Sequence, residues 1–271
     1  MTKSLILLLA YTFIPALVLA GTRTDTVVLK VKYAATLKTT MEDKATSKDE
    51  HILLIGKNMS KYYSLWEEIR EQVSDSLSAA GITGTEKAVM MHKNASIPQE
   101  TETSTIYKGL TNKNTLTVTD VIFNKFGYIY EEPVPVVDWQ LVECDTIIAG
   151  YECKKAVGRL RGRTWTAWYA IDLPYDNGPW KLQGLPGLIL YAVESEHIFS
   201  FKCNGIESVN DVNDFSLDKR KYDKCTPKIL QDEKTEFWKD QTGFITRKAL
   251  GMNIESFKSE TGFIPCFIEY Y

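Results

Sequence analysis

Gly184-Leu185-Pro186-Gly187-Leu188-Ile189 is the stretch from which the fold prediction starts. Proline fixes φ at about −65° and glycine accepts a positive φ, so Pro186 and Gly187 suit the second and third positions of a type II turn. The run that follows, Leu188 to Val193, is apolar on both faces of an extended chain, as in a strand that is covered on two sides. The sequence therefore predicts a tight turn that leads into a buried strand.

The segment before this turn, Arg163 to Ile171, also has a strand pattern. One face carries Trp165, Ala167, Tyr169 and Ile171, and the other face is half apolar. Further strand-like runs lie on both sides of this region, and the connections between the runs from Ile106 to Cys144 are too short for the helical crossovers that parallel strands require. They cover residues 26–38, 51–55, 59–64, 106–109, 115–123, 128–131, 136–144 and 198–203. An antiparallel meander is expected, with the runs around Gly56-Lys57-Asn58 forming a hairpin.

An amphipathic helix is predicted to begin after Ser64, because apolar residues recur from Leu65 to Ala80 at helical spacing. Ser64 and Glu67 form a capping-box pattern, and Gly81 suits the C-terminal end. We expect its Trp-containing stripe to pack in the core. A shorter helix is expected after Thr226, with Pro227 in its first turn.

The remaining segments have weaker patterns. Residues 84–105 are predicted to be loop-rich with one short strand at Ala88–Met91, and the chain is expected to be less regular from about residue 205. The predicted fold class is therefore mainly β (α+β). It is a curved antiparallel sheet or open half-barrel with one principal amphipathic helix and a short C-terminal helix.

The first 20 residues resemble a cleaved signal peptide, with Lys3, an apolar run and Val18-Leu19-Ala20 before the expected cleavage. The mature chain, residues 21–271, has no later apolar stretch long enough to span a bilayer. We expect export to the periplasm, the outer membrane or the medium. The formal charge of the whole chain is −3, with no basic stripe, which argues against nucleic-acid binding.

Five cysteines lie in the mature part of the chain. In an oxidising compartment they could form two bridges. The candidate pairs are Cys144 with Cys153, across a predicted turn, and Cys203 with Cys225, around a polar loop. Spacing does not settle the pairing, and the alternative is that all five, including Cys266, are reduced thiols.

Several motifs along the chain resemble the GLPGLI family of exported bacterial proteins. They are Trp139, Gly150-Tyr151-Glu152-Cys153, Gly162-Arg163, Trp165-Thr166-Ala167-Trp168-Tyr169, Pro174, Gly178-Pro179-Trp180-Lys181 and Gly184-Leu185-Pro186-Gly187-Leu188-Ile189. Leu53-Leu54-Ile55-Gly56 and Ser60-Lys61-Tyr62-Tyr63 extend the resemblance toward the N-terminus. The resemblance implies a single exported domain over residues 21–271, and it supplies no catalytic residues.

The motif block has two interpretations. In the first it is structural, with Gly178, Pro179, Gly184, Leu185, Pro186 and Gly187 shaping turns, and Gly178 and Gly184 letting the backbone approach an aromatic ring. In the second, a set of aromatic and basic side chains rims a pocket for an apolar or aromatic ligand that carries negative charge. The candidate ligand-binding residues are Arg163, Trp165, Trp168, Tyr175, Trp180 and Lys181.

No common catalytic or metal-binding motif is present, so no catalytic residue, metal or cofactor is predicted. His51, His92 and His197 are far apart in the sequence. His197 with Glu194 and Glu196 is read as a charged, solvated turn rather than part of a metal site. The preferred hypothesis is a non-catalytic module that binds a small apolar ligand or an envelope protein. The alternatives are a hydrolase whose site is assembled from dispersed residues, which His51, His92 or His197 beside a carboxylate and a nucleophile would favour, and a structural component of the envelope.

Overall fold

A computed structural model describes residues 24–38, 46–94, 102–251 and 265–271. The predicted signal peptide and its cleavage point lie outside these residues. Within them no helix is both long and apolar enough to cross a bilayer.

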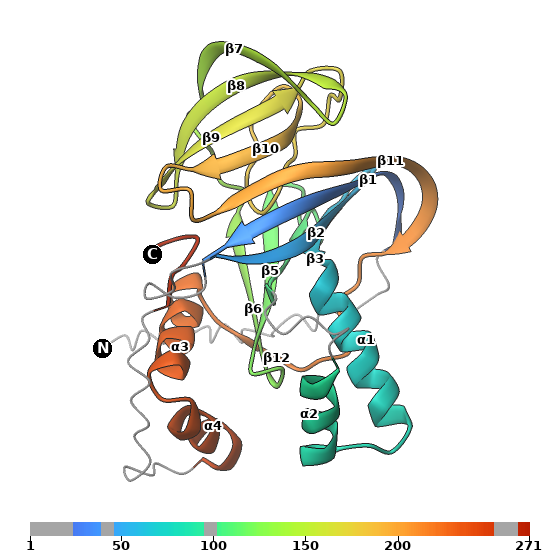
Figure 1. Cartoon of the computed structure of the whole chain (residues 1–271), viewed down its shortest axis with the longest axis vertical. Coiled ribbons are helices and arrows are strands. Elements are labelled where there is room, and N and C mark those ends of the chain that lie inside the picture. The colour runs from blue at the N-terminus through green and yellow to red at the C-terminus, as the bar shows by residue number, and fades with distance from the viewer. Residues whose placement is uncertain (1–23, 39–45, 95–101, 252–264) are drawn as a thin grey trace, which may run out of the picture.

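In the described residues twelve strands form one sheet, and four helices accompany it (Figure 1). The strands are β1 (Thr24–Leu37), β2 (Ser47–Gly56), β3 (Ser60–Ser64), β4 (Thr105–Lys108), β5 (Thr115–Ile122), β6 (Phe126–Pro133), β7 (Gln140–Ile148), β8 (Tyr151–Leu160), β9 (Arg163–Ala170), β10 (Leu188–Glu194), β11 (Ser200–Asp214) and β12 (Tyr222–Lys224). The helices are α1 (Leu65–Ala79), α2 (Gly84–Lys93), α3 (Pro227–Lys239) and α4 (Gln241–Leu250).

The sheet is curved and open, with β12 at one edge and β7 at the other. Its strand order is β12-β6-β5-β4-β3-β2-β1-β11-β10-β9-β8-β7. All neighbours are antiparallel except β12 and β6. The long β1–β11 pairing joins residues near the two ends of the chain, since Thr24 lies opposite Asp214 and Thr36 opposite Ser200. The predicted mainly β, α+β class and the curved antiparallel sheet are confirmed.

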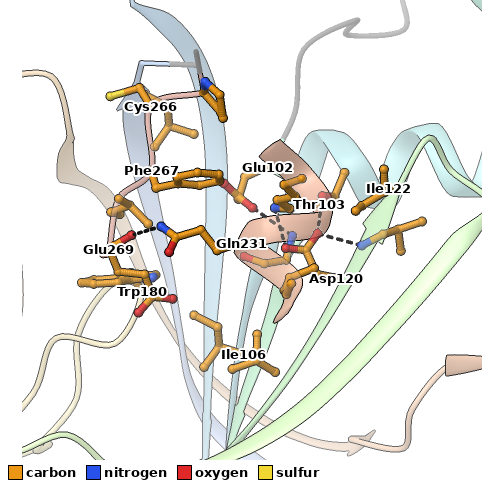
Figure 2. Close-up of a pocket in the computed structure, with 18 of the residues that line it drawn as sticks. Glu102, Thr103, Ile106, Asp120, Ile122, Trp180, Gln231, Cys266, Phe267 and Glu269 are labelled. Atoms are coloured by element: carbon orange, nitrogen blue, oxygen red, sulfur yellow. Dashed lines mark hydrogen bonds and ion pairs between the residues drawn. The ribbon is translucent and has the colours of Figure 1, made fainter. Parts of the chain in front are cut away.

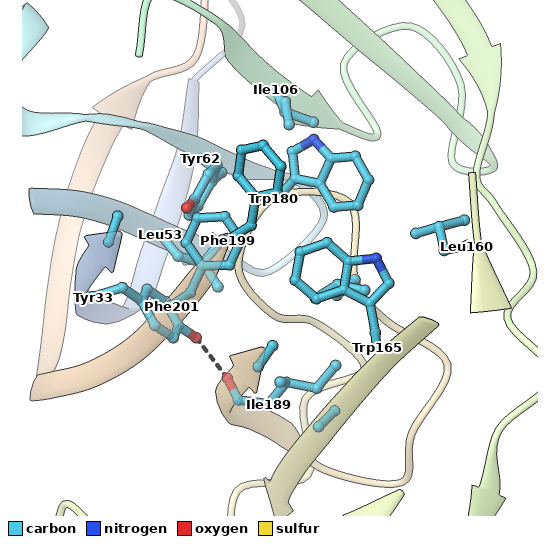
Figure 3. Packing of buried hydrophobic residues seen from close by; sticks show 14 of the residues in the cluster. Tyr33, Leu53, Tyr62, Ile106, Leu160, Trp165, Trp180, Ile189, Phe199 and Phe201 are labelled. Atoms are coloured by element: carbon cyan, nitrogen blue, oxygen red, sulfur yellow. Dashed lines mark hydrogen bonds between the residues drawn. The ribbon is translucent and has the colours of Figure 1, made fainter. Parts of the chain in front are cut away.

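The core contains the strands predicted to be most buried. Trp165, Ala167 and Tyr169 on β9 have at most 2% of their surface exposed. Trp165 stacks on Phe201 of β11, with the ring centres 6.1 Å apart (Figure 3). Both faces of β10 are buried, as its apolar pattern indicates. Ile171, placed on the same face by prediction, lies beyond the end of β9 and is 47% exposed.

Helix α1 begins where the sequence predicts, because the Ser64 side chain accepts a hydrogen bond from the backbone N–H of Glu67. Gly81 has a positive φ just after its end. The expected core packing of its stripe is wrong, however. Leu65, Trp66 and Ile69 are only half-buried, and the one buried residue of the helix is Glu67. The reason is that α1 meets the sheet only near its start, so its remaining turns run away from β2 and β3 (Figure 1).

Three further expectations need correction. Residues 84–93 form helix α2 instead of a loop with a strand at Ala88–Met91, and the helix has no buried residue, so its sequence lacks the apolar periodicity that marks a core element. Regular structure continues from residue 205 to Leu250 through β11, β12, α3 and α4, whereas residues 252–264 lie outside the described part of the chain. Strand β7 starts at Gln140, and Val136, predicted to begin it, is 93% exposed. The predicted C-terminal helix is confirmed as α3, which Thr226 caps by accepting from the N–H of Ile229.

Neither predicted disulfide forms, because all five cysteines are free. Cys153 lies opposite Thr146 across the β7–β8 pair, and Cys144 falls in the irregular part of β7. Cys203 lies on β11 opposite Tyr33, whereas Cys225 follows the edge strand β12. Strands β1 to β6 separate these last two positions in the sheet.

Candidate functional site

A cavity of about 360 Å³ lies between the sheet, helix α3 and the C-terminal segment 265–271 (Figure 2). Strands β2 to β6 supply one wall, and α3 supplies another through Leu230, Gln231 and Lys234. Most of the lining side chains are apolar, and many are aromatic. The aromatic residues of the lining are Tyr62, Phe123, Tyr130, Trp180, Phe199, Phe201, Phe237, Trp238, Phe267 and Tyr271. A cavity of this size and composition suits a small ligand with an apolar body.

A hydrogen-bonded chain of three side chains lines one part of the cavity. The Asp49 carboxylate lies 3.2 Å from Nε2 of His51, and Nδ1 of His51 contacts the Tyr62 hydroxyl. The other Asp49 oxygen accepts from the hydroxyl of Ser64 at 2.9 Å. In the tautomer whose Nε2 proton is directed at Asp49, Nδ1 of His51 accepts a hydrogen bond from the Tyr62 hydroxyl. Burial raises the pKa of the Tyr62 hydroxyl well above its ordinary value, so Tyr62 is protonated at neutral pH.

A second polar group joins the sheet to α3. Asp120 on β5 accepts a hydrogen bond from the Thr103 hydroxyl at 2.6 Å and pairs with Lys234 of α3 at 2.6 Å. Burial lowers the pKa of Lys234, but the attraction and hydrogen bond of Asp120, together with the attraction of Glu102 and Glu269, outweigh burial and raise the pKa overall. Lys234 therefore keeps its charge, and the pair anchors α3 over the cavity.

The third polar group surrounds Lys181. Its ammonium lies 2.7 and 2.9 Å from the two oxygens of Glu269 and 2.6 Å from Glu132. The hydroxyls of Tyr130 and Tyr271 lie 3.0 and 3.1 Å away. Burial, with the nearby carboxylates, raises the pKa of both tyrosines. Only 1% of the Lys181 side chain is exposed, so these oxygens take the place of water around its ammonium.

Arg163 holds the C-terminal segment from the side of β9. Its guanidinium donates to the backbone oxygen of Phe267 at 2.6 Å and to the Tyr270 hydroxyl at 3.1 Å. It also lies 3.5 Å from the carboxylate of Glu194, which is 1% exposed, and 3.7 Å from Glu196. Both cations expected to face a ligand, Arg163 and Lys181, thus already have carboxylate partners within the chain.

The six predicted ligand-binding residues occupy different places. Trp180 and Lys181 line the cavity. Trp165 lies behind Trp180, with ring centres 5.6 Å apart, and is fully buried. Arg163 contacts the C-terminal segment, as described above. Trp168 points to the other face of β9 and stacks on Tyr191 at 4.7 Å, while Tyr175 lies in the connection before Gly178; neither lines the cavity.

Sequence reasoning missed most of the polar lining, including Asp49, Tyr62, Asp120, Lys234 and Glu269. One signal was available, since Asp49 and His51 are two residues apart on a strand and therefore share a face. The β2–β3 hairpin then places Tyr62 opposite Leu53, beside that pair. The other polar residues come from α3 and the C-terminal segment, whose position no local pattern reveals.

The expected type II turn at Leu185–Leu188 is wrong in its details. The N–H of Leu188 donates to the backbone oxygen of Leu173, so no hydrogen bond closes the turn. Gly187 does not have a positive φ; among the motif residues Gly184 does, at 88°. Gly187 is needed for space, because a Cβ there would lie 2.1 Å from the backbone oxygen of Ala170.

The structure also tests the predicted aromatic neighbours of Gly184 and Gly178 and the predicted solvated turn at residues 194–197. Gly184 lies beside the ring of Trp139, as expected, whereas a Cβ at Gly178 would meet Leu182 and Ile189 rather than an aromatic ring. The turn at residues 194–197 is not fully solvated, because Glu194 is buried and accepts from the N–H groups of Glu196 and Ile198. In the part of the chain that the structure describes, no three His, Cys, Asp or Glu side chains gather as metal ligands would.

Comparison with known proteins gives limited information. Residues 160–191, which include β9, Trp180, Lys181 and the Gly-Leu-Pro-Gly motif, match a family described as protein of unknown function (Porph_ging). This match supports an uncharacterised family, with which the GLPGLI resemblance is compatible. No curated protein matches the chain.

Two structures of PNGF-II, in space groups P21 and C2, are similar to this chain. Their TM-scores are 0.49 and 0.47, each with 13% sequence identity. The similarity covers 76% and 75% of this chain, and 33% and 32% of the PNGF-II chains. The present chain therefore spans about a third of the length of these proteins.

Proposed function

We propose that this protein is an exported, non-catalytic binding module that holds a small ligand with an apolar body in the cavity beneath α3. The observation that carries the proposal is the aromatic lining of the cavity of about 360 Å³ between the sheet, α3 and the C-terminal segment. Apolar contact with these walls would supply most of the binding free energy. The polar side chains would orient the ligand and add little binding free energy, because most of their hydrogen-bonding capacity is already used within the protein.

Native mass spectrometry of protein recovered from its own cell tests the proposal. The expected result is a mass excess that denaturation releases as a small molecule. Leu230→Trp, which fills the cavity from α3, should abolish the mass excess. Leu250→Trp is the matched control, because Leu250 is 67% exposed and lies away from the cavity. Equal ligand content in the two variants, both folded by circular dichroism, would contradict the proposal.

The second candidate is the hydrolase, and one observation favours it. His51 lines the cavity with a carboxylate on one ring nitrogen and a hydroxyl on the other, which is an arrangement suited to proton transfer. The Ser64 hydroxyl, the stronger candidate nucleophile by residue type, points at Asp49 instead of His51. We therefore rank this candidate second.

A simple ester assay separates the two candidates. If the protein only binds a ligand, the wild type should release 4-nitrophenol from 4-nitrophenyl acetate no faster than the variants His51→Gln and Tyr62→Phe. The hydrolase would replace the binding proposal if the wild type released 4-nitrophenol faster than buffer does. This release would also have to be lost in both variants and kept in Leu250→Trp.

A further inference from the structure

We propose that the Glu269 carboxylate occupies an anion-binding site at Lys181, and that the acid group of a ligand takes its place there. The inference rests on the proposed binding function and adds the ligand class, a monocarboxylate on an apolar body. It also makes the C-terminal segment 265–271 a strap that competes with the ligand for Lys181.

The geometry of Lys181 is that of a built anion site. Both oxygens of Glu269 lie within 2.9 Å of the ammonium, which also contacts the hydroxyls of Tyr130 and Tyr271 and, at 2.6 Å, the carboxylate of Glu132. Lys181 lines the cavity and is almost fully buried, whereas 14% of the Glu269 side chain is exposed. A charge-assisted contact in such a site is strong, because little water competes for the ammonium.

The charge balance favours an anion at this place. Lys181 and Arg161 both pair with Glu132, each at 2.6 Å. With Glu269 present the two cations face two carboxylates. Without it they share the single charge of Glu132, which leaves one uncompensated positive charge at the cavity wall. A buried charge without a partner is costly, so the site requires a carboxylate from the strap or from a ligand.

The contacts of the strap allow a ligand carboxylate to replace Glu269 at Lys181. The Arg163 side chain donates to the backbone oxygen of Phe267. The Gln231 side chain donates to the backbone oxygen of Glu269 at 3.1 Å (Figure 2). The N–H of Tyr270 donates to the backbone oxygen of Arg161 at 3.2 Å, and Pro265 forms an isolated β-bridge, but the strap is not one of the strands of the sheet. Movement of residues 266–271 would therefore leave the pairing between the strands β1 to β12 intact.

The apolar body of the ligand has a place next to the acid group. Trp180 precedes Lys181 and lines the cavity, and the sheet contributes Tyr62 and Ile106 to the same lining, which does not depend on the strap. A ligand with its carboxylate on Lys181 would thus extend its apolar part along aromatic walls. Uncharged ligands of the same shape would gain the wall contacts but would not displace Glu269.

Decanoate and decanol are suitable probes, because they share an apolar chain and differ in the acid group. Calorimetry would measure both with the wild type, Glu269→Gln, Lys181→Met and Glu236→Gln. The last is the control, since Glu236 pairs with Arg247 on the surface and its side chain is 60% exposed. We expect Glu269→Gln to bind decanoate about tenfold more tightly than the wild type, Lys181→Met to lose about tenfold, and decanol affinity to change little.

The possible results separate the two proposals. If decanol and decanoate bind equally to every variant, the cavity function stands and the anion site is overturned. If neither probe binds any folded variant, the proposed cavity function is overturned for apolar ligands, and the anion site with it.

A measurement without ligand tests the strap itself. Cys266 on the strap is buried, so its alkylation rate reports opening. Glu269→Gln should speed alkylation of Cys266 but leave the core thiols Cys153 and Cys203 protected. Equal acceleration at all three cysteines would indicate global destabilisation and would contradict a strap that moves alone.

Discussion

At the scale of single residues, Asp25 fixes the turn between β2 and β3. Its carboxylate accepts from the N–H groups of Asn58 and Met59 at 2.7 and 2.9 Å and from that of Thr26 at 2.9 Å. Burial alone raises the pKa of Asp25, but these hydrogen bonds outweigh it and hold the pKa below its ordinary value of 3.8. The ionised form is therefore the one that stabilises the fold.

The pH dependence of stability follows from that shift. The contribution of Asp25 is complete above its unfolded pKa, near 3.8, and is lost as the pH falls through the lower pKa of the folded state. Asp25→Asn should lower the free energy of unfolding at neutral pH by about 1–2 kcal/mol. Below about pH 4 the stability of this variant should decrease less with falling pH than that of the wild type. Urea unfolding across this pH range measures both effects. Asp75→Asn on the exposed side of α1 is the control, and an identical pH profile in the two variants would rule out the assigned role.

Gly187 is a residue whose importance comes from packing. A Cβ at this position would lie 2.1 Å from the backbone oxygen of Ala170 and 2.6 Å from its carbonyl carbon, and neither atom can move without displacing the end of β9. Gly187→Ala should lower the free energy of unfolding by about 2 kcal/mol or more.

Gly205→Ala is the matched control for this prediction. Its nearest neighbours are side-chain atoms of Lys32 at 3.7 Å, and it too lacks a positive φ. Thermal and urea unfolding of the two variants should differ clearly. Equal stability of Gly187→Ala and Gly205→Ala would contradict the prediction, because it would mean that the connection before β10 can move to make room for a Cβ.

At the scale of elements, the start of α1 links the helix to the polar chain of the cavity. The Ser64 hydroxyl accepts from the N–H of Glu67 at 3.0 Å and donates to Asp49 at 2.9 Å. Ser64→Ala removes a helix cap and a buried hydrogen bond together, so we expect a loss of about 2 kcal/mol. Ser76→Ala, on the exposed part of the same helix, should change stability little. Urea unfolding compares the two variants. A similar decrease in the free energy of unfolding in both would show that the Ser64 cap and its bond to Asp49 add no particular stability.

The same element shows what sequence patterns can and cannot predict. The helix start at Ser64, the β2–β3 hairpin, the buried faces of β9 and β10 and the Thr226 cap of α3 all follow from local rules. The burial of the α1 stripe does not, because it depends on where the helix leaves the sheet. Helix α2 is missed since it buries no residue, and apolar periodicity detects only elements that face a core.

At the scale of the whole molecule, the candidate site joins segments that are far apart in sequence. Asp49 and His51 come from β2, Lys181 from the connection between β9 and β10, Lys234 from α3 and Glu269 from the strap. Single-sequence patterns locate Trp180 and Lys181 but not their partners. The long-range β1–β11 pairing and the position of α3 bring these residues together, and neither leaves a local signal.

The redox state of the five cysteines is a property of the whole chain, and the structure predicts five free thiols. After denaturation without a reductant, alkylation should label all five in the intact mass. In the native protein we expect Cys144 to react first, because it is exposed, and the buried Cys153, Cys203 and Cys266 to react last. Burial raises the pKa of Cys153 to about 11, which further lowers its thiolate fraction at neutral pH. Protein that retained a Cys144–Cys153 or Cys203–Cys225 bridge would show only three labels, and strands β7, β8 or β11 would then have to shift from the register described above.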